Sequence, residues 1–190
     1  MRKKTKKSLL NALFDVRVPV AVLMALGVGG LSIPATAQAV KKDLEIVSRT
    51  ISFLKSVTTP TVIMAIIEDP TNPASVSNAD AVVAFFTSNS KAGKKKLSVL
   101  KVSASDQDQL ANVDVIFIPK GLEAVHADIG QQAKLLQKLA ISTDDSCARN
   151  GHCAVSAKST PRVEILVNQA TTNESGVKFS PAFLMLVKKL

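Results

Sequence analysis

The sequence predicts an α/β fold: a mixed, mostly parallel sheet with helices on both faces, a C-terminal β-hairpin and a final helix. Two observations predict this class. Segments with the apolar spacing of amphipathic helices alternate along the chain with short apolar runs, which is the order of α/β architectures. The run T-V-I-M-A-I-I at residues 61–67 is apolar on both faces and rich in β-branched side chains, as strands inside a parallel sheet are.

The first half of the chain is expected to contain two helix–strand units. The apolar spacing within D-L-E-I-V-S-R-T-I-S-F-L predicts an amphipathic helix that ends before Pro60. Asn72 is suited to cap the second helix, with Pro73 in its first turn. The predicted elements are helix 43–57, strand 61–67, helix 73–90 and strand 96–103.

The second half is expected to close with a hairpin and a helix. The stretch R-V-E-I-L-V-N alternates apolar and polar side chains, which predicts a strand with one buried face, and Thr160-Pro161 separates it from the preceding arm. Ser180 is suited to cap the final helix, with Pro181 at its first position. The predicted elements are a short helix near 105–108, strand 113–119, a helix from about 122 to 139, a short strand at 139–143, hairpin arms 154–159 and 162–168, and a helix to the end of the chain.

The N-terminus has the three parts of a secretory signal peptide. M-R-K-K-T-K-K is basic, residues 18–33 are apolar, and A-T-A precedes the expected cleavage after Ala37, with Ala39 as the alternative. The other interpretation is an uncleaved membrane anchor, although the apolar run is short for the roughly 20 residues of a span. We expect residues 1–37 to be removed and 38–190 to form a single periplasmic domain.

The charge of the chain is partly a property of this leader. The leader carries six of the 24 Lys and Arg residues and one of the 15 Asp and Glu residues, so residues 38–190 keep a net charge of +4 rather than +9. The one remaining basic cluster, K-A-G-K-K-K at 91–96, lacks interleaved aromatic residues and is expected to be a solvated turn. Nucleic acid is therefore not an expected partner.

The two cysteines lie in one short loop, D-D-S-C-A-R-N-G-H-C-A-V. In an exported protein, Cys147 and Cys153 are expected to form a disulfide. A zinc site is the second interpretation, but it needs about four ligands, and only His152 and the weaker Asp144 or Asp145 lie close in sequence. A free dithiol is the third.

The sequence favours no catalytic activity. It contains no G-x-S-x-G, H-E-x-x-H or P-loop motif, and its two histidines, His126 and His152, lie far apart in sequence. His126 lies beside the apolar face of the predicted helix at 122–139, where packing is a commoner role than ligation. The acidic pairs at 68–69 and 144–145 are sequence neighbours, which point apart in extended chain. No catalytic residue, metal or cofactor is expected.

The C-terminal third resembles the YfiR family of small periplasmic proteins. The resemblance rests on N-Q-A-T-T-N-E-S-G-V-K-F-S-P-A-F-L-M-L-V and on a cysteine loop before a hairpin. The residues at the family's spacing are Asn168, Ala170, Gly176, Val177, Phe179, Ser180 and Leu184. The chain departs from the family in having no Trp or Tyr and in carrying T-T-P at 58–60, where the family has aromatic residues.

The resemblance implies a regulatory function. The best-known members of the family restrain a diguanylate cyclase of the inner membrane by contacting its periplasmic part, and their disulfide state tunes that restraint. It thus implies a cyclic-di-GMP signalling regulator whose partner is a membrane diguanylate cyclase or a sensor kinase, and whose Cys147 and Cys153 are bridged. A homodimer is the other assembly that the sequence leaves open.

The alternative function is binding of a small solute in a transport or sensing system. The fold class resembles one lobe of a periplasmic-binding protein, and such sheets hold ligands at the carboxyl ends of their strands. Four residues follow predicted strands there, namely Glu68, Asp69, Lys120 and Gly121. A free-standing receptor closes two lobes over its ligand, whereas residues 38–190 supply about one.

Overall fold

The computed structural model of the protein describes residues 35–190, and their side chains from residue 40 on. The predicted leader, residues 1–37, lies outside these residues except for its last three, and its cleavage stays a prediction. The helices are α1 (Ala35–Ser52), α2 (Pro73–Ser88), α3 (His126–Leu135), α4 (Asp145–Arg149), α5 (Gln169–Glu174) and α6 (Pro181–Leu184), with 3₁₀ turns η1 (Asp108–Asn112) and η2 (Glu123–Val125). Within the described range, none of them is long and apolar enough to cross a membrane.

One sheet organises the described residues. Its strands are β1 (Thr61–Glu68), β2 (Lys91–Ala92), β3 (Lys95–Ser103), β4 (Val115–Ile118), β5 (Leu139–Ser142), β6 (Val155–Lys158), β7 (Glu164–Val167) and β8 (Lys188–Lys189). They lie in the order β2-β3-β1-β4-β5-β6-β7-β8. Only the β2–β3 and β6–β7 pairs are antiparallel. The predicted mixed, mostly parallel sheet is confirmed.

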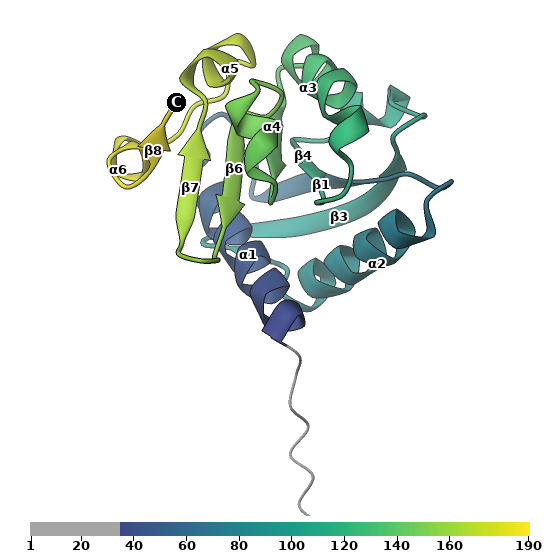
Figure 1. Ribbon diagram of the computed structural model, residues 1–190. Coiled ribbons are helices and arrows are strands. Elements are labelled where there is room, and N and C mark those ends of the chain that lie inside the picture. The colour runs from purple at the N-terminus through teal and green to yellow at the C-terminus, as the bar shows by residue number, and fades with distance from the viewer. Residues whose placement is uncertain (1–34) are drawn as a thin grey trace, which may run out of the picture. The chain divides into compact units, whose positions relative to one another are not determined.

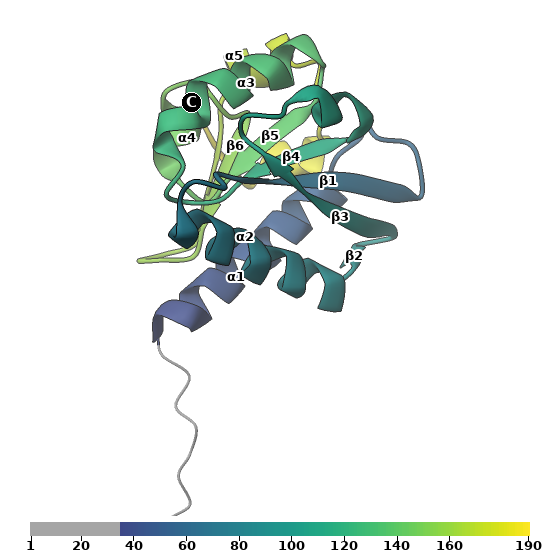
Figure 2. The same cartoon turned by 90° about the vertical axis from the view of Figure 1, so that its right-hand side faces the viewer.

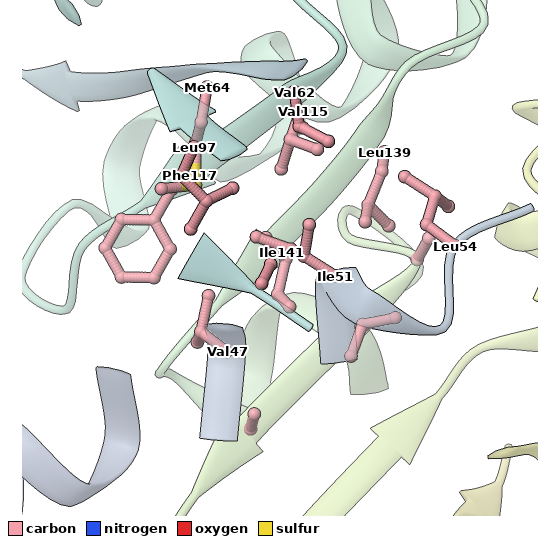
Figure 3. Close-up of a cluster of buried hydrophobic side chains, with 14 of the residues drawn as sticks. Val47, Ile51, Leu54, Val62, Met64, Leu97, Val115, Phe117, Leu139 and Ile141 are labelled. Atoms are coloured by element: carbon pink, nitrogen blue, oxygen red, sulfur yellow. The ribbon is translucent and has the colours of Figure 1, made fainter. Parts of the chain in front are cut away.

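Helices cover both faces of the sheet (Figures 1 and 2). α1 and α2 lie on one face, and α3 and α4 on the other. β1 shows why its sequence is apolar throughout: Val62, Met64 and Ile66 belong to the core under α1 and α2, whereas Ala65 and Ile67 belong to the core on the opposite face. Figure 3 shows the first of these cores, in which side chains of α1 meet those of the central strands. Each central strand therefore buries both faces.

The structure differs from several of the predicted elements. The helix predicted from about 122 to 139 begins at His126 and ends at Leu135, and the 3₁₀ turn η2 precedes it. The first helix spans Ala35–Ser52 instead of 43–57, because Leu54 leaves it to form a bridge with Phe179. The cysteine loop contains a helix, α4, that the sequence pattern did not indicate. The final helix ends at Leu184, and the chain then returns to the sheet as β8, where the Leu190 amide donates to the Val167 carbonyl at 2.9 Å.

The basic stretch at 91–96 is a tight turn between β2 and β3, as expected in part. Lys91, Lys94 and Lys96 are exposed. Lys95 differs from them, because its ammonium group donates to the carbonyls of Leu54 and Val57 just after α1. Partial burial lowers the pKa of Lys95 in this position. The turn is thus solvated on one side and tied to the end of α1 on the other.

Candidate functional site

A cavity of about 380 Å³ opens between α1, α2 and the loops that follow β4 and β5. Its position follows from the sheet order. The connection after β1 leads to β3 on one side, and the connection after β4 leads to β5 on the other, so the chain leaves the neighbouring strands β1 and β4 in opposite directions. Ligands of α/β sheets bind at such switch points, beyond the carboxyl ends of the strands. The lining residues are Val40, Asp43, Leu44, Asn78, Ala81, Val82, Phe117, Pro119, Lys120, Gly121, Glu123 and Thr143.

The cavity has an apolar interior and a polar rim. Leu44, Val82 and Phe117 belong to the hydrophobic core and form part of its wall. At the rim, the Asp43 carboxylate is fixed by the backbone amide of Ser159, which donates to it at 2.6 Å. A mostly apolar cavity with a few polar groups at defined positions is the usual form of a small-molecule site.

The structure separates the four residues predicted for the crevice. Lys120 and Gly121 line the cavity. Glu68 instead forms an ion pair with Lys101 at 3.0 Å. Asp69 accepts hydrogen bonds from the hydroxyl and the amide of Thr71, and these lower the pKa of the Asp69 carboxyl. Neither acid belongs to the cavity lining.

Two acidic residues that the sequence analysis did not select line the cavity. Asp43 comes from α1 and Glu123 from the loop after β4. Sequence spacing gave no signal for them, because 80 residues separate the two positions and only the tertiary fold brings α1 over the carboxyl end of β4. The P-K-G turn directs the chain into η2, and Gly121 has a φ of +93°, which disfavours any other residue type.

Glu123 connects the cavity rim to the cysteine loop. Its side chain lies close to Asp144, and Asp144 caps α4 by accepting from the Ser146 amide at 2.8 Å. Burial alone would raise the pKa of the Asp144 carboxyl, but the hydrogen bonds that this carboxyl accepts from Ser146 act against burial, and the pKa is lowered. Among the described residues, neither Glu123 nor Asp144 has an ion-pair partner within 4 Å.

His126 is buried beside this pair. Only 2% of the residue is exposed, and Nε2 has no hydrogen-bond partner in the described part of the chain. Burial lowers the pKa of the imidazole, although the charges of Asp144 and Glu123 act to raise it and His152 adds to the lowering. Packing, the role expected for this residue, agrees with its position.

The lowered pKa of His126 predicts a loss of stability in mild acid. The unfolded chain binds this proton near the ordinary value of about 6.5, whereas the folded protein binds it only at lower pH. The free energy of unfolding should therefore fall as the pH drops below about 6.5, above the range in which carboxylates titrate. Urea titrations between pH 7 and about pH 5.5 should show a shallower slope for H126Q than for the parent. Equal slopes in the two proteins would contradict the prediction.

Cys147 and Cys153 form a disulfide with a Cα–Cα distance of 5.1 Å, and both residues are fully buried. The bond joins α4 to the start of β6. Because both sulfurs are bonded to each other, the zinc and dithiol interpretations do not describe this structure. Over the described residues, no group of three or more His, Cys, Asp and Glu side chains is arranged to hold a metal.

Removing the disulfide should cost moderate stability. The enclosed loop is short, so the chain-entropy estimate for C147S/C153S is a loss of about 2 kcal/mol in the free energy of unfolding. Urea denaturation measures this loss, and capture of a membrane partner is measured separately. Lost capture with little lost stability would indicate a redox-sensing role, whereas a proportionate loss of both indicates a structural one.

The residues on which the resemblance to the YfiR family rests stabilise the C-terminal segment. The Asn168 side chain caps α5 and donates to the Ala148 carbonyl at 2.9 Å, which ties the cysteine loop to α5. Ser180 caps α6, and Val177 and Phe179 belong to the core. Gly176 follows α5 with a φ of +61°, a conformation suited to glycine at a helix end.

The C-terminal segment also carries the most exposed large apolar side chains of the described residues. Met185 is 86% exposed and Leu186 is 78% exposed, and they are adjacent in the chain. Leu135 at the end of α3 is 68% exposed. Sequence analysis missed Met185 and Leu186 as surface residues, because a final helix running to residue 190 would have placed part of this apolar run against the core.

Comparison with known proteins identifies the fold and a family. The family model described as YfiR/HmsC-like matches residues 64–188. A search of curated proteins finds no match.

Solved structures with similar folds share little sequence. A conserved domain protein from Vibrio cholerae O1 biovar El Tor strain N16961 has a TM-score of 0.58 at 11% identity, over 79% of this chain and 59% of that one. A ligand-free, open substrate-binding protein with adhesive properties from Clostridium difficile gives 0.53 at 12%, over 80% and 59%. An ABC domain from Streptococcus pneumonia in complex with L-Trp gives 0.50 at 10%, over 78% and 59%. The chain spans about three fifths of each, and its fold corresponds to one lobe of the substrate-binding proteins.

Proposed function

The chain belongs to the YfiR/HmsC-like family, and from this premise we propose that it is a non-catalytic periplasmic regulator that restrains a diguanylate cyclase of the inner membrane. The family match over residues 64–188 carries the proposal. The disulfide supports it, because buried disulfides persist in oxidising compartments such as the periplasm. The proposed arrangement is a leader at 1–37 followed by a single regulatory domain at 38–190. A sensor kinase of the inner membrane is the alternative partner.

We further propose that the partner binds at Met185 and Leu186. Contiguous exposed apolar side chains mark protein interfaces more often than ordinary surface does. α6 and β8 hold these two residues at one edge of the sheet (Figure 1), where Lys189 adds positive charge beside them, whereas Lys188 forms an ion pair with Glu164 at 3.5 Å. An acidic rim on the partner would complement that charge.

The proposal predicts a specific loss of partner capture. The full chain is tagged at its C-terminus, expressed with its own leader and purified from gently solubilised inner membranes, and captured proteins are identified by mass spectrometry. The parent should bring down a membrane cyclase or sensor kinase, and M185D/L186D should lose it by tenfold or more with unchanged melting temperature. L135D is the matched control, because Leu135 is similarly exposed but lies on α3, and it should keep the partner. Equal capture by both variants would contradict this contact surface.

A second candidate function is solute binding, which the cavity at the switch point favours. In that case the same purification should recover transporter subunits, or the protein alone, and cyclic-di-GMP levels should not change on deletion of the gene. Under the regulatory proposal those levels should rise, because an active cyclase loses its restraint.

A further inference from the structure

The cavity beyond β4 combines two features that together describe a ligand. Its wall is built from core side chains such as Leu44, Val82 and Phe117, which suits an apolar group. Its lining includes the acids Asp43 and Glu123, and Asp144 of the adjoining loop lies close to Glu123. An apolar interior with acids at its mouth is complementary to a molecule with an apolar body and a positive end.

Neither Asp43 nor Glu123 forms an ion pair with a basic side chain of the described residues. The Asp43 carboxylate accepts from the backbone amide of Ser159, which carries no charge. Lys120 is the only basic residue among the described residues of the cavity lining, and its ammonium forms no ion pair with either acid. His126, buried and with Nε2 unpartnered, interacts electrostatically with Asp144 and Glu123 but forms no ion pair with them.

A metal ion is not the cation that this rim fits. Metal ions in proteins need several ligands at fixed distances, and the described residues contain no such group of three or more acidic, His or Cys side chains. A primary ammonium group needs only acceptors, because it carries three donors that carboxylates can share. An ammonium at Glu123 would leave the rest of the molecule to fill the apolar interior.

From these contacts we propose that the cavity binds a small organic cation, namely a primary amine with an apolar body of about the size of a phenyl ring. Glu123 and Asp43 accept from the ammonium group. Leu44, Val82 and Phe117 contact the apolar body. Binding does not depend on the regulatory role, since it requires only the cavity.

Binding at Glu123 would also affect the cysteine loop. The Glu123 side chain lies close enough to Asp144 to act on its carboxyl, and Asp144 caps α4, the helix that carries Cys147. An ammonium bound at Glu123 would change the charge beside this cap. A ligand in the cavity would thus act on the disulfide loop through Glu123 and Asp144, without a change in the redox state of the cysteines.

Calorimetric titration of the full chain, expressed with its leader and purified from the periplasm, tests the proposal with three probes. Phenethylamine has the amine and the ring, 3-phenylpropionate has the ring with the opposite charge, and ethylamine has the amine alone. Phenethylamine should bind at least tenfold more tightly than either of the others. A preference for 3-phenylpropionate, or no heat from any probe at millimolar concentration, would overturn the proposal.

Three variants locate the binding. Glu123→Gln should weaken phenethylamine about tenfold, the effect of roughly 1.4 kcal/mol for one charge-assisted contact. Ala81→Phe, at an exposed position of the lining, should block the cavity and abolish binding while the melting temperature stays near that of the parent. Glu45→Gln is the matched control, because Glu45 is an exposed acid of α1 outside the cavity lining. If E45Q weakens binding as much as E123Q, the effect is general electrostatics and the site is wrong. Capture of the membrane partner is measured on E123Q as well, because it tests the regulatory proposal separately from amine binding in the cavity.

Discussion

Replacing Gly130 with Ala is expected to lower the free energy of unfolding by about 3 kcal/mol, although Ala in a helix normally stabilises by up to about 1 kcal/mol relative to Gly. A Cβ atom at this position would lie 2.2 Å from the carbonyl oxygen of His152 and 2.9 Å from its carbonyl carbon and Cα. These are backbone atoms of the disulfide loop, so no side-chain rotation relieves the overlap. The helix and the loop must separate instead.

Urea denaturation of G130A measures this cost. Ala127→Gly is the matched control on the same helix, since Ala127 is exposed and its replacement should cost only the helix propensity of about 1 kcal/mol. A thiol assay should show that the disulfide stays intact in G130A, which separates the packing cost from loss of the bond. A G130A protein at least as stable as the parent would mean that α3 does not approach the disulfide loop this closely.

Gly130 also illustrates which part of the fold the sequence could not supply. Its role depends on residue 152, which lies across the loop and β5, and no local pattern indicates that contact. By contrast, the apolar run of β1 predicted a strand buried on both faces because burial on two sides is a local property of the sequence. Lys120 and Gly121 could be placed at the site because the carboxyl ends of parallel strands meet at one edge.

The parts that were missed are those decided by tertiary contacts. Asp43 lines the cavity only because α1 lies across the carboxyl end of β4. The helix predicted for the last residues ends at Leu184, and the chain continues as β8. A helix and the pairing of β8 with β7 would both satisfy the backbone hydrogen-bonding groups, but the pairing also places Val187 against the core. Local propensity cannot decide between two such solutions.

Replacing Phe183 with Ala is expected to produce the largest loss of stability, about 3 to 5 kcal/mol, because it removes a large side chain from a packed core. Phe183 is 1% exposed, and its ring centroid lies 5.2 Å from that of Phe53 and 4.8 Å from that of Phe179. These three rings join the end of α1 to the segment before α6. The cavity left by Ala would be bounded by secondary structure on both sides and could not collapse fully.

The same substitution should release the proposed contact surface from the sheet. Met185 and Leu186 lie two and three residues after Phe183 in the chain, so F183A should reduce partner capture as well as stability. Phe85→Ala is the control, because Phe85 is only partly buried and contacts Phe86 from the surface of α2; it should cost less and leave capture unchanged. Urea denaturation and capture are measured on both variants. If F183A loses stability but keeps its partner, the partner does not bind at Met185 and Leu186, and the binding surface lies on elements that the ring cluster does not hold.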